Sequence, residues 1–325
     1  MTGFLLRRLV NYVVLCLVAT FLAFALASLT FEPLANLQGQ NPPPSAAAVE
    51  AKRLELGLDE PIPQRFVRWM GGVVQGDFGT TITGVEVTDE LVTRVGVTLR
   101  LLLIGTTVGV VAGVLVGVAS AIRQYRFGDY AATVFSFVVL SIPVFVMAQL
   151  LKFGGLQLNQ AAGTSVLYTQ GEVTPSFQGS AWAELLDRVQ HLVLPTLAIV
   201  LAQIAFYSRY QRSAMLDVLG SDFLRTARAK GLTRRRALFT HGLRTALIPM
   251  ATLFAFGFGL LLTGSVFIER IFGWYGMGNW FVAGVVEQDT NIVTTVTLFA
   301  AVLILISAWL SDLLYAALDP RIRVS

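Results

Sequence analysis

Six stretches without a charged side chain constrain this chain more than any other feature. They cover residues 9–31, 101–122, 130–151, 189–208, 245–268 and 290–311. The hydrocarbon core of a bilayer is about 30 Å thick and takes roughly 20 helical residues to cross, so each stretch is long enough for one span. Hydrophobic residues make up 55% of the chain and charged residues only 14%, unlike ordinary soluble domains. The sequence therefore predicts an all-α membrane protein with six transmembrane helices.

The basic residues predict how these helices are oriented. If both termini lie inside, the inner segments hold 15 of the 24 Lys and Arg residues but only five of the 20 acids. The net charge is then +10 inside and −6 outside. Because cytoplasmic loops carry an excess of Lys and Arg, we expect both termini and residues 209–244 in the cytoplasm and residues 32–100 outside. The overall charge of +4 is partitioned in this way and gives no indication of nucleic-acid binding.

The amino terminus shares features with a secretory signal. Arg7 and Arg8 precede an apolar run, and Ala25-Leu26-Ala27 has the composition of a cleavage site. The run is longer than the 7–15 residues usual in a signal, so we expect an uncleaved first span. Cys16, the single cysteine, lies in this span and has no partner for a disulfide within the chain. We expect it to serve as small packing volume.

The segment 32–100 is predicted to form a small external subdomain between the first two spans. Its pattern favours helices over residues 47–56 and 64–74, with turns at Gly57 and Gly76. The chain then divides into a cytoplasmic N-terminus with helix 1 (1–31), this subdomain, and a five-helix core (101–325).

One further loop is expected within that core. The uncharged stretch 153–171 is rich in Gly, Gln, Asn and Thr. Such a stretch cannot face lipid unless it is helical, because its backbone groups would lack hydrogen-bond partners. We therefore expect an external loop there.

The segment between the fourth and fifth spans has the pattern of two short helices. Ser221 or Asp222 can cap the first helix, Gly231 can end it in a left-handed conformation, and Thr233 can cap the second. A short helix between two spans needs something outside the bilayer to dock on. The alternative is a basic loop whose positive charge only fixes the topology.

This segment resembles the cytoplasmic "EAA" loop of ATP-binding-cassette importer permeases, in the form found in the dipeptide, oligopeptide and nickel permeases. Arg225-Thr226-Ala227 stands where sugar-type permeases have Glu-Ala-Ala, and Pro249 follows Gly231 by 18 residues. In that family the loop forms the coupling helix, which sits in a cleft of the ATPase subunit.

Further motifs of the same family occur in the same order over nearly the whole chain. They are Leu56-Gly57-Leu58-Asp59 before Pro61, Gly76-Asp77-Phe78-Gly79, Ser141-Ile142-Pro143-Val144-Phe145, His191-Leu192-Val193-Leu194-Pro195, Glu269-Arg270-Ile271-Phe272, Gly273-Trp274-Tyr275-Gly276-Met277-Gly278 and Asp319-Pro320-Arg321. Two departures stand out: Phe31-Glu32-Pro33-Leu34 lies near the place of the family's Pro-Gly-Asp-Pro, and Tyr275 replaces a proline.

The resemblance implies the first (B-type) permease subunit of a peptide importer in a bacterial plasma (inner) membrane. The implied partners are a homologous second permease, one or two cytoplasmic ATPases that hold ATP and Mg²⁺, an external substrate-binding protein, the lipid bilayer and a peptide substrate. This chain itself is expected to bind no cofactor.

The resemblance also implies which residues meet the ATPase, through the loop 222–249. Phe223 and Leu224 are expected as apolar anchors, Arg225 and Arg228 as ionic contacts, and Gly231 as the turn. The full set is Asp222, Phe223, Leu224, Arg225, Thr226, Ala227, Arg228, Gly231 and Leu232.

The translocation pathway is expected between the second, third and fifth spans. Ser141 and Pro143 lie where a proline bends the third span. Gly257 and Gly259 would allow close backbone approach in the fifth.

What the sequence lacks argues against an enzyme. It contains no Gly-x-x-x-x-Gly-Lys-Ser/Thr loop to hold ATP phosphates. No buried chain of acids or histidines, no cluster with metal-ligand spacing and no nucleophile–base pair is apparent. His191 is expected to form hydrogen bonds at the membrane interface, and the alternative is a metal or proton ligand. For the function of the whole chain, two alternatives to peptide import remain. One is import of nickel or another small solute, and the other is a self-sufficient secondary transporter, which would show inverted repeats with broken helices.

Overall fold

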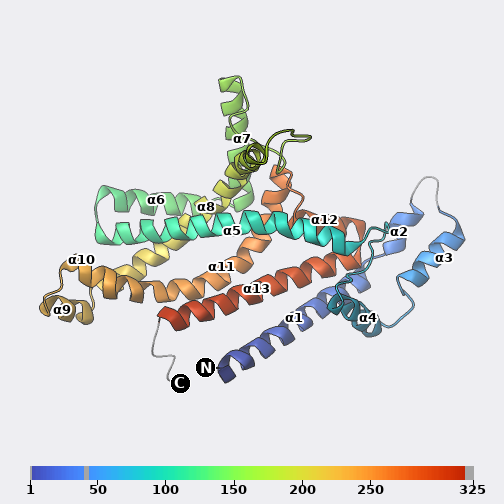
Figure 1. Ribbon diagram of the computed structural model, residues 1–325, viewed down its shortest axis with the longest axis horizontal. Helices are drawn as coiled ribbons and strands as arrows, with labels where there is room; N and C mark the ends of the chain where they lie inside the picture. The colour runs from blue at the N-terminus through green and yellow to red at the C-terminus, as the bar shows by residue number, and fades with distance from the viewer. Residues whose placement is uncertain (1, 40–43, 319–325) are drawn as a thin grey trace. The chain divides into compact units, whose positions relative to one another are not determined.

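The computed structural model describes residues 2–39 and 44–318, and its regular structure is helical (Figure 1). Within these residues, the β-type pairing is limited to an isolated bridge between Thr80 and Glu86. The all-α prediction is therefore confirmed for the described part of the chain. The Asp319-Pro320-Arg321 motif lies outside the described residues.

Long helices alternate with short ones. The long ones are α1 (Thr2–Thr30), α5 (Val87–Ile122), α8 (Ala181–Leu219), α11 (Leu243–Phe272) and α13 (Thr290–Leu318). The shorter ones are α2 (Pro33–Gln38), α3 (Ala46–Glu55), α4 (Ile62–Val74), α6 (Phe127–Ser141), α7 (Val144–Ala162), α9 (Asp222–Ala229), α10 (Arg234–Ala237) and α12 (Met277–Glu287). A π-helical segment, Leu238–Gly242, joins α10 to α11.

Several helices have the length and composition of membrane spans. Within the described residues, four qualify on their own: Arg7–Thr30 of α1, α5, α8 and Thr290–Leu314 of α13. The bent pair of α6 and α7 would make a fifth. The predicted span 245–268 lies within α11, a helix in which several side chains are outside the description. The chain is thus a multi-helix membrane protein, and the count of six spans stays a prediction.

The third predicted span, 130–151, is not one straight helix. α6 and α7 differ in direction by 104°, and Pro143 occupies the N-cap position of α7. Proline has no N–H to continue the ladder of α6, and its ring clashes with the preceding turn. α7 then continues to Ala162 and ends at Gly163, which has a φ of 66°. The prediction of a loop over 153–171 was therefore wrong for its first ten residues.

Two compact parts can be distinguished in the chain. We call residues 99–274 with 306–318 the α8 part, and residues 2–98 with 275–305 the α4 part. The boundaries between them fall inside α5 and α13 and directly after Trp274.

In the α4 part, an aromatic contact holds α4 against α1. The rings of Phe21 and Phe66 are 5.1 Å apart and nearly perpendicular, and those of Phe24 and Trp69 are 6.2 Å apart. Such pairs add about 0.5–1.5 kcal/mol beyond the area they bury. The positions of α3 and α4 confirm the two predicted helices to within two residues. The predicted turns are also confirmed, because Gly57 and Gly76 have φ values of 60° and 87°.

The turn that follows α4 is tied to the start of α13. The buried Asp289 carboxylate accepts hydrogen bonds from the backbone N–H of Ile82 at 2.7 Å and of Ile292 at 3.1 Å. Asn291 donates to the carbonyl oxygen of Thr80 at 2.8 Å. Burial raises the pKa of the Asp289 carboxyl, while the backbone N–H groups of Ile82 and Ile292 act against the rise. Charge-assisted bonds of this kind are about twice as strong as neutral ones.

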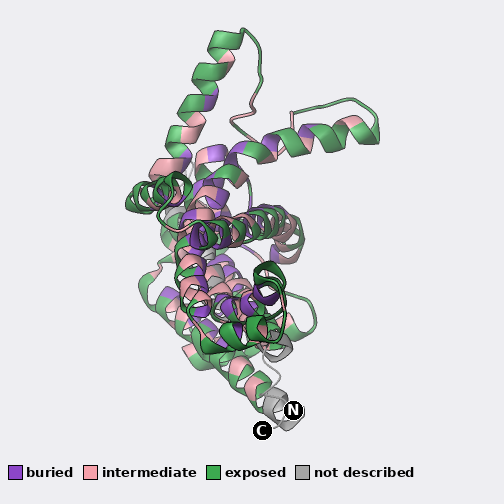
Figure 2. Cartoon of the chain, turned by 90° about the vertical axis from the view of Figure 1, so that its left-hand side faces the viewer, coloured by how far each residue is buried: buried purple, intermediate pink, exposed green. Residues whose placement is uncertain are grey.

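In the α8 part, a row of glycines brings α5 against α8. Gly105, Gly109, Gly113 and Gly117 recur every four residues, so they share one face of α5. A Cβ atom at Gly109 would lie 2.5 Å from Cβ of Gln203, and one at Gly113 would lie 2.8 Å from Cβ of Tyr207. Small residues at four-residue spacing let membrane helices approach closely. Figure 2 shows that buried residues gather where helices meet and that exposed ones cover the outward faces.

An ion pair between the buried Asp129 and the partly buried Arg212 fixes α6 to α8. The carboxylate of Asp129, 3% exposed, accepts from Nε of Arg212 at 2.6 Å and from Nη2 at 2.8 Å. The backbone N–H of Tyr125 donates to the same carboxylate at 3.0 Å. The hydroxyls of Ser136 and Ser208 meet at 3.1 Å along the same interface. Each charge of the pair is therefore satisfied by its partner, as buried charges require.

The glycine row gives a first prediction. Gly109→Ala is expected to lower the melting temperature of the purified protein, because overpacking costs about 1–3 kcal/mol. Gly96→Ala in the same helix is the matched control. No atom lies within 4 Å of its Cβ position, so the gain of roughly 0.5–1 kcal/mol in helix stability should leave the melting temperature unchanged or raised. Equal effects of the two substitutions, measured by thermal unfolding, would contradict the role of the row.

Candidate functional site

The short helix between α8 and α11 begins directly after α8. α8 ends at Leu219, and Ser221 takes the N-cap position of α9 in extended conformation. The hydroxyl of Ser221 does not cap α9. Instead it donates to the carbonyl oxygen of Val218 at 2.6 Å. The position of the cap is thus as predicted, while the side chain secures the end of α8.

The turn after α9 has the hydrogen bonds of a Schellman motif. The N–H of Gly231 donates to the carbonyl of Arg228 at 3.0 Å, and the N–H of Leu232 to that of Ala227 at 3.3 Å. Gly231 has a φ of 93°, a conformation that side chains with a Cβ disfavour. The predicted left-handed end of the helix is confirmed.

The second predicted helix starts where expected but does not stand alone. The hydroxyl of Thr233 accepts from the N–H of Arg236 at 3.3 Å, so Thr233 is the N-cap of α10. α10 passes through the π-helical segment directly into α11. Figure 1 shows α9 and α10 together at the end of α8 and α11. Within this segment, α9 is therefore a separate short helix, whereas α10 continues into α11.

One face of α9 packs on the protein itself. Leu224 is 5% exposed and joins a buried cluster, here called the α9 seat, with Ala227 and Leu232 packed at its edge. The other members of the seat come from α5, α8, α10, α11 and the π-helical segment: Val118, Ala121, Met215, Val218, Ala237, Leu238 and Ala246. Leu224 was expected to anchor a partner. In the structure its side chain is instead buried within the chain. Ala227 and Leu232 likewise face inward.

The opposite face of α9 is open. Phe223 is 43% exposed, and the side chains of Asp222 and Arg225 are 94% and 78% exposed, with a long contact of 3.4 Å between them. Thr226 and Arg228 are also exposed. An exposed ion pair of this kind contributes at most about 1 kcal/mol to stability. The outer face of α9 is therefore one aromatic ring surrounded by solvated charges.

The predicted pathway residues lie at two separate places in the α8 part. Ser141 and Pro143 are exposed at the bend between α6 and α7, and the Ser141 hydroxyl donates to the carbonyl of Val138 at 2.7 Å. Gly257 in α11 faces the hydroxyl of Tyr207, which would be 2.9 Å from an added Cβ atom. The surroundings of Gly259 lie outside the described residues.

A polar row on α8 was missed by the sequence reasoning. Gln203, Tyr207 and Gln211 are at most 6% exposed and follow one another at four-residue spacing. Within the described residues, the amide nitrogens of both glutamines, the Gln211 amide oxygen and the Tyr207 hydroxyl have no hydrogen-bond partner. An unpaired buried polar group costs about 1–3 kcal/mol. The spacing of these polar residues inside an apolar stretch was the signal available in the sequence.

His191 has a structural environment. It is 3% exposed, its Nδ1 donates to the carbonyl oxygen of Asp187 at 2.8 Å, and its ring lies 4.2 Å from that of Tyr168. The Asp187 carboxylate accepts from Thr174 at 2.6 Å and 2.8 Å. The predicted hydrogen-bonding role of His191 is confirmed. Across residues 2–39 and 44–318, no group of three His, Cys, Asp or Glu side chains could hold a metal ion.

Comparison with known families gives matches along nearly the whole chain. Residues 109–324 match the family model described as "binding-protein-dependent transport system inner membrane component". Residues 1–87 match the model of the N-terminal region of such membrane components. The first match covers well over half of the chain and contains α9 with both of its flanking helices.

Individual relatives agree with the family matches. The oligopeptide transport system permease protein OppB of Mycobacterium tuberculosis is 56% identical over 325 residues, which is 100% of both chains. The oligopeptide transport system permease protein AppB of Bacillus subtilis is 35% identical, over 99% of this chain and 100% of the relative. The di/tripeptide transport system permease protein DppB of Pseudomonas aeruginosa is 33% identical, over 99% of each.

The two faces of α9 give a second prediction. Leu224→Ala is expected to lower the melting temperature of the purified protein, because removing a buried leucine costs about 2–5 kcal/mol. Phe223→Ala, at the neighbouring exposed position, should change stability by no more than about 0.5 kcal/mol. Thermal unfolding of both variants checks this. A stable Leu224→Ala protein would mean that α9 is not held by its seat.

Proposed function

The chain belongs to the binding-protein-dependent transport system inner membrane component family, and on that basis we propose that it is the first permease subunit of an ATP-driven peptide importer. The peptide cargo is supported by the relatives, whose names specify oligopeptides or di- and tripeptides. Nickel remains the alternative cargo to be tested beside peptides. The family match, the absence of a phosphate-binding loop and the arrangement of α9 together favour a subunit driven by a separate ATPase.

The two-faced packing of α9 is the observation that carries this function. A loop that only supplied positive charge would not need a helix that ends in a Schellman motif and has a buried leucine on one face and an exposed phenylalanine on the other. We assign the contact with the ATPase to the outer face, where Phe223 is the apolar anchor and Asp222, Arg225, Thr226 and Arg228 surround it. Aromatic and arginine side chains are the types most enriched among residues that dominate binding energy at interfaces.

The inner face explains how a movement of the ATPase would reach the membrane helices. Leu224, Ala227 and Leu232 rest on the α9 seat, to which α5, α8 and α11 all contribute. Packed apolar side chains behave as a close-packed solid. A displacement of α9 would therefore move the ends of three helices together, as a rigid-body transition requires.

The proposed partners are those that membership of this family implies. One permease provides half of a pathway, so a homologous second permease is needed, with one or two ATPases that hold ATP and Mg²⁺ and an external substrate-binding protein. We place the pathway beside the bend at Ser141 and Pro143 and near Gly257 and Gly259. The exposed proline bend and the Tyr207 hydroxyl that faces Gly257 support this placement.

We also propose the orientation in a bacterial inner membrane. Both termini and α9 lie in the cytoplasm, and α3 and α4 lie outside, because the basic residues are concentrated on the first side. The external subdomain of residues 32–100 then joins the membrane core through α5, which begins at Val87.

A labelling experiment checks the orientation. Ser45→Cys and Thr240→Cys are both at exposed positions, whereas the native Cys16 is buried and adds little background. A membrane-impermeant thiol reagent added to intact cells should label the cysteine at position 45 and not the one at position 240. The reverse pattern would contradict the proposed topology.

Gly231→Val tests the coupling role. A branched side chain at a φ of 93° is strained by roughly 1–3 kcal/mol, so α9 should lose its fixed position. Peptide uptake by the reconstituted complex is expected to fall at least about tenfold, and ATPase co-purification should weaken. Gly84→Val is the matched control, since Gly84 has a φ of 84° and also has open space around its Cβ position.

The outcomes of this experiment separate the alternatives. Normal uptake by Gly231→Val would leave the loop with a purely topological role. An equal loss in Gly84→Val would show that backbone strain anywhere abolishes transport. ATP hydrolysis by this subunit alone, or uptake of nickel but of no peptide by the wild-type complex, would contradict the proposed function itself.

A further inference from the structure

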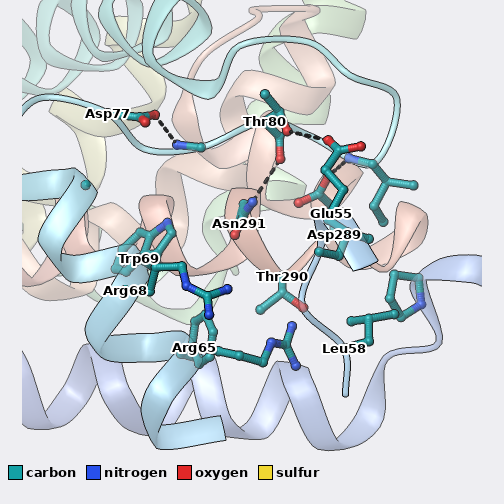
Figure 3. Close-up of a pocket in the computed structure, with 16 residues that line it drawn as sticks. Glu55, Leu58, Arg65, Arg68, Trp69, Asp77, Thr80, Asp289, Thr290 and Asn291 are labelled. Atoms are coloured by element: carbon teal, nitrogen blue, oxygen red, sulfur yellow. Dashed lines mark hydrogen bonds between the residues drawn. The ribbon is translucent and has the colours of Figure 1, made fainter. Parts of the chain in front are cut away.

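A cavity of about 240 Å³ lies in the α4 part. α4 provides one wall, the turn that follows α3 and the turn at residues 77–82 provide others, and the start of α13 closes it. Figure 3 shows Arg65 and Arg68 extending from α4 toward the interior, with Thr290 opposite. The surrounding walls include the apolar side chains of Leu56, Leu58 and Trp69. The cavity therefore combines two guanidinium groups with an apolar lining.

Arg65 differs from the other charged groups that line this cavity in the contacts that its side chain makes. Its guanidinium is partly buried and lies 5.6 Å from the ring of Phe24. Within the described residues, none of the ion pairs includes Arg65, and residues 36–43 contain no acid. Burial lowers the pKa of this guanidinium, and the charge of Glu60, which is itself paired with Arg68, acts against the shift.

The other charged groups of the cavity are already engaged. Arg68 is paired with Glu60. Glu55 accepts from Lys52 at 2.8 Å and from the Thr80 hydroxyl at 3.4 Å. Two backbone N–H groups bind Asp289, and the Asp77 carboxylate accepts from the N–H of Gly79 at 2.8 Å. An anion entering the cavity would therefore meet one guanidinium whose donors are free to bind it.

We propose that this cavity is a peptide-binding site in which Arg65 holds the C-terminal carboxylate of an arriving peptide. A carboxylate matches the planar, forked donors of a guanidinium. Leu56, Leu58 and Trp69 provide the apolar contact for the last side chain. The volume is below the roughly 300–1,000 Å³ of sites that enclose a whole ligand, so only the end of the peptide enters. This site rests on the proposed function, and it lies on the side that the proposed topology places outside the membrane.

The binding of a fluorescent pentapeptide tests the proposal. The wild-type permease complex with its ATPases, reconstituted in lipid nanodiscs without the substrate-binding protein, is titrated with the peptide carrying either a free or an amidated C-terminus. Hydrogen bonds to charged groups are worth about 1.5–3 kcal/mol, so the free acid should bind about tenfold or more tightly. Because the protein is unchanged in this comparison, folding cannot account for the difference.

Substitutions locate the effect. Arg65→Gln should bind the acid and the amide with equal affinity. Arg53→Gln is the matched control, since Arg53 on the neighbouring α3 has an exposed ion pair with Asp59 at 2.6 Å and does not line the cavity. It should retain the preference for the acid. Arg65→Lys keeps the charge without the fork and should retain a reduced preference.

Three results would overturn the proposal. The wild-type complex could bind acid and amide equally, Arg53→Gln could abolish the preference as fully as Arg65→Gln, or Arg65→Gln could retain the full preference for the acid. The proposed function has a separate readout, because peptide uptake by the full complex would continue in each of these cases. If the wild-type full complex took up no peptide at all, that result would instead contradict the proposed function.

Discussion

The close approach of α5 to α8 determines much of the α8 part. Lipid offers no hydrophobic driving force between helices, so association depends on packing and on polar contacts. The glycine row from Gly105 to Gly117 removes every Cβ atom from one face of α5, which lets the backbone of α5 lie on the side chains of α8. α8 then carries Arg212 to Asp129 and so fixes α6. Its carboxyl end supplies Met215 and Val218 to the α9 seat. The position of α9 therefore depends on a contact that begins deep in the predicted bilayer.

Local rules gave the ends of α9 from the sequence, but not its orientation. Gly231 and Thr233 were identified because a left-handed residue and a cap are decided by neighbours within about four positions. The inward side of Leu224 could not be found in this way, because it depends on Val118 and Ala246, which are distant in sequence. A helix of eight residues with both apolar and charged side chains has two possible faces toward a partner. Only the tertiary contact distinguishes them, and it leaves Phe223 outside.

In the third predicted span, local sequence rules likewise predict that a proline bends the helix but not by how much. The motif around Pro143 predicted a bend, and the backbone chemistry of proline is sufficient for that. The size of the bend, 104°, depends on what the following segment packs against. α7 starts against α11, where the rings of Phe145 and Phe267 are 5.8 Å apart. Gly155 leaves room for Leu194, whose Cδ1 would lie 2.8 Å from an added Cβ atom. The polar composition of residues 153–162 indicated a loop, yet these contacts favour a continued helix.

Two arginines of this chain show how structural and functional charges can be distinguished. Arg212 lies against a carboxylate that is 3% exposed, and two short hydrogen bonds hold the pair. Its charge is satisfied within the chain, so it stabilises the contact between α6 and α8 without needing a ligand. Arg65 is partly withdrawn from solvent, and the charge of Glu60 acts on it without a direct ion pair. Its guanidinium lies 5.6 Å from the ring of Phe24, and a ring contributes only about 0.5–2 kcal/mol to a cation. Withdrawing a charge from water without an ionic partner is costly. That cost would be recovered when an anion arrives, which is the behaviour expected of a binding residue rather than of a structural one.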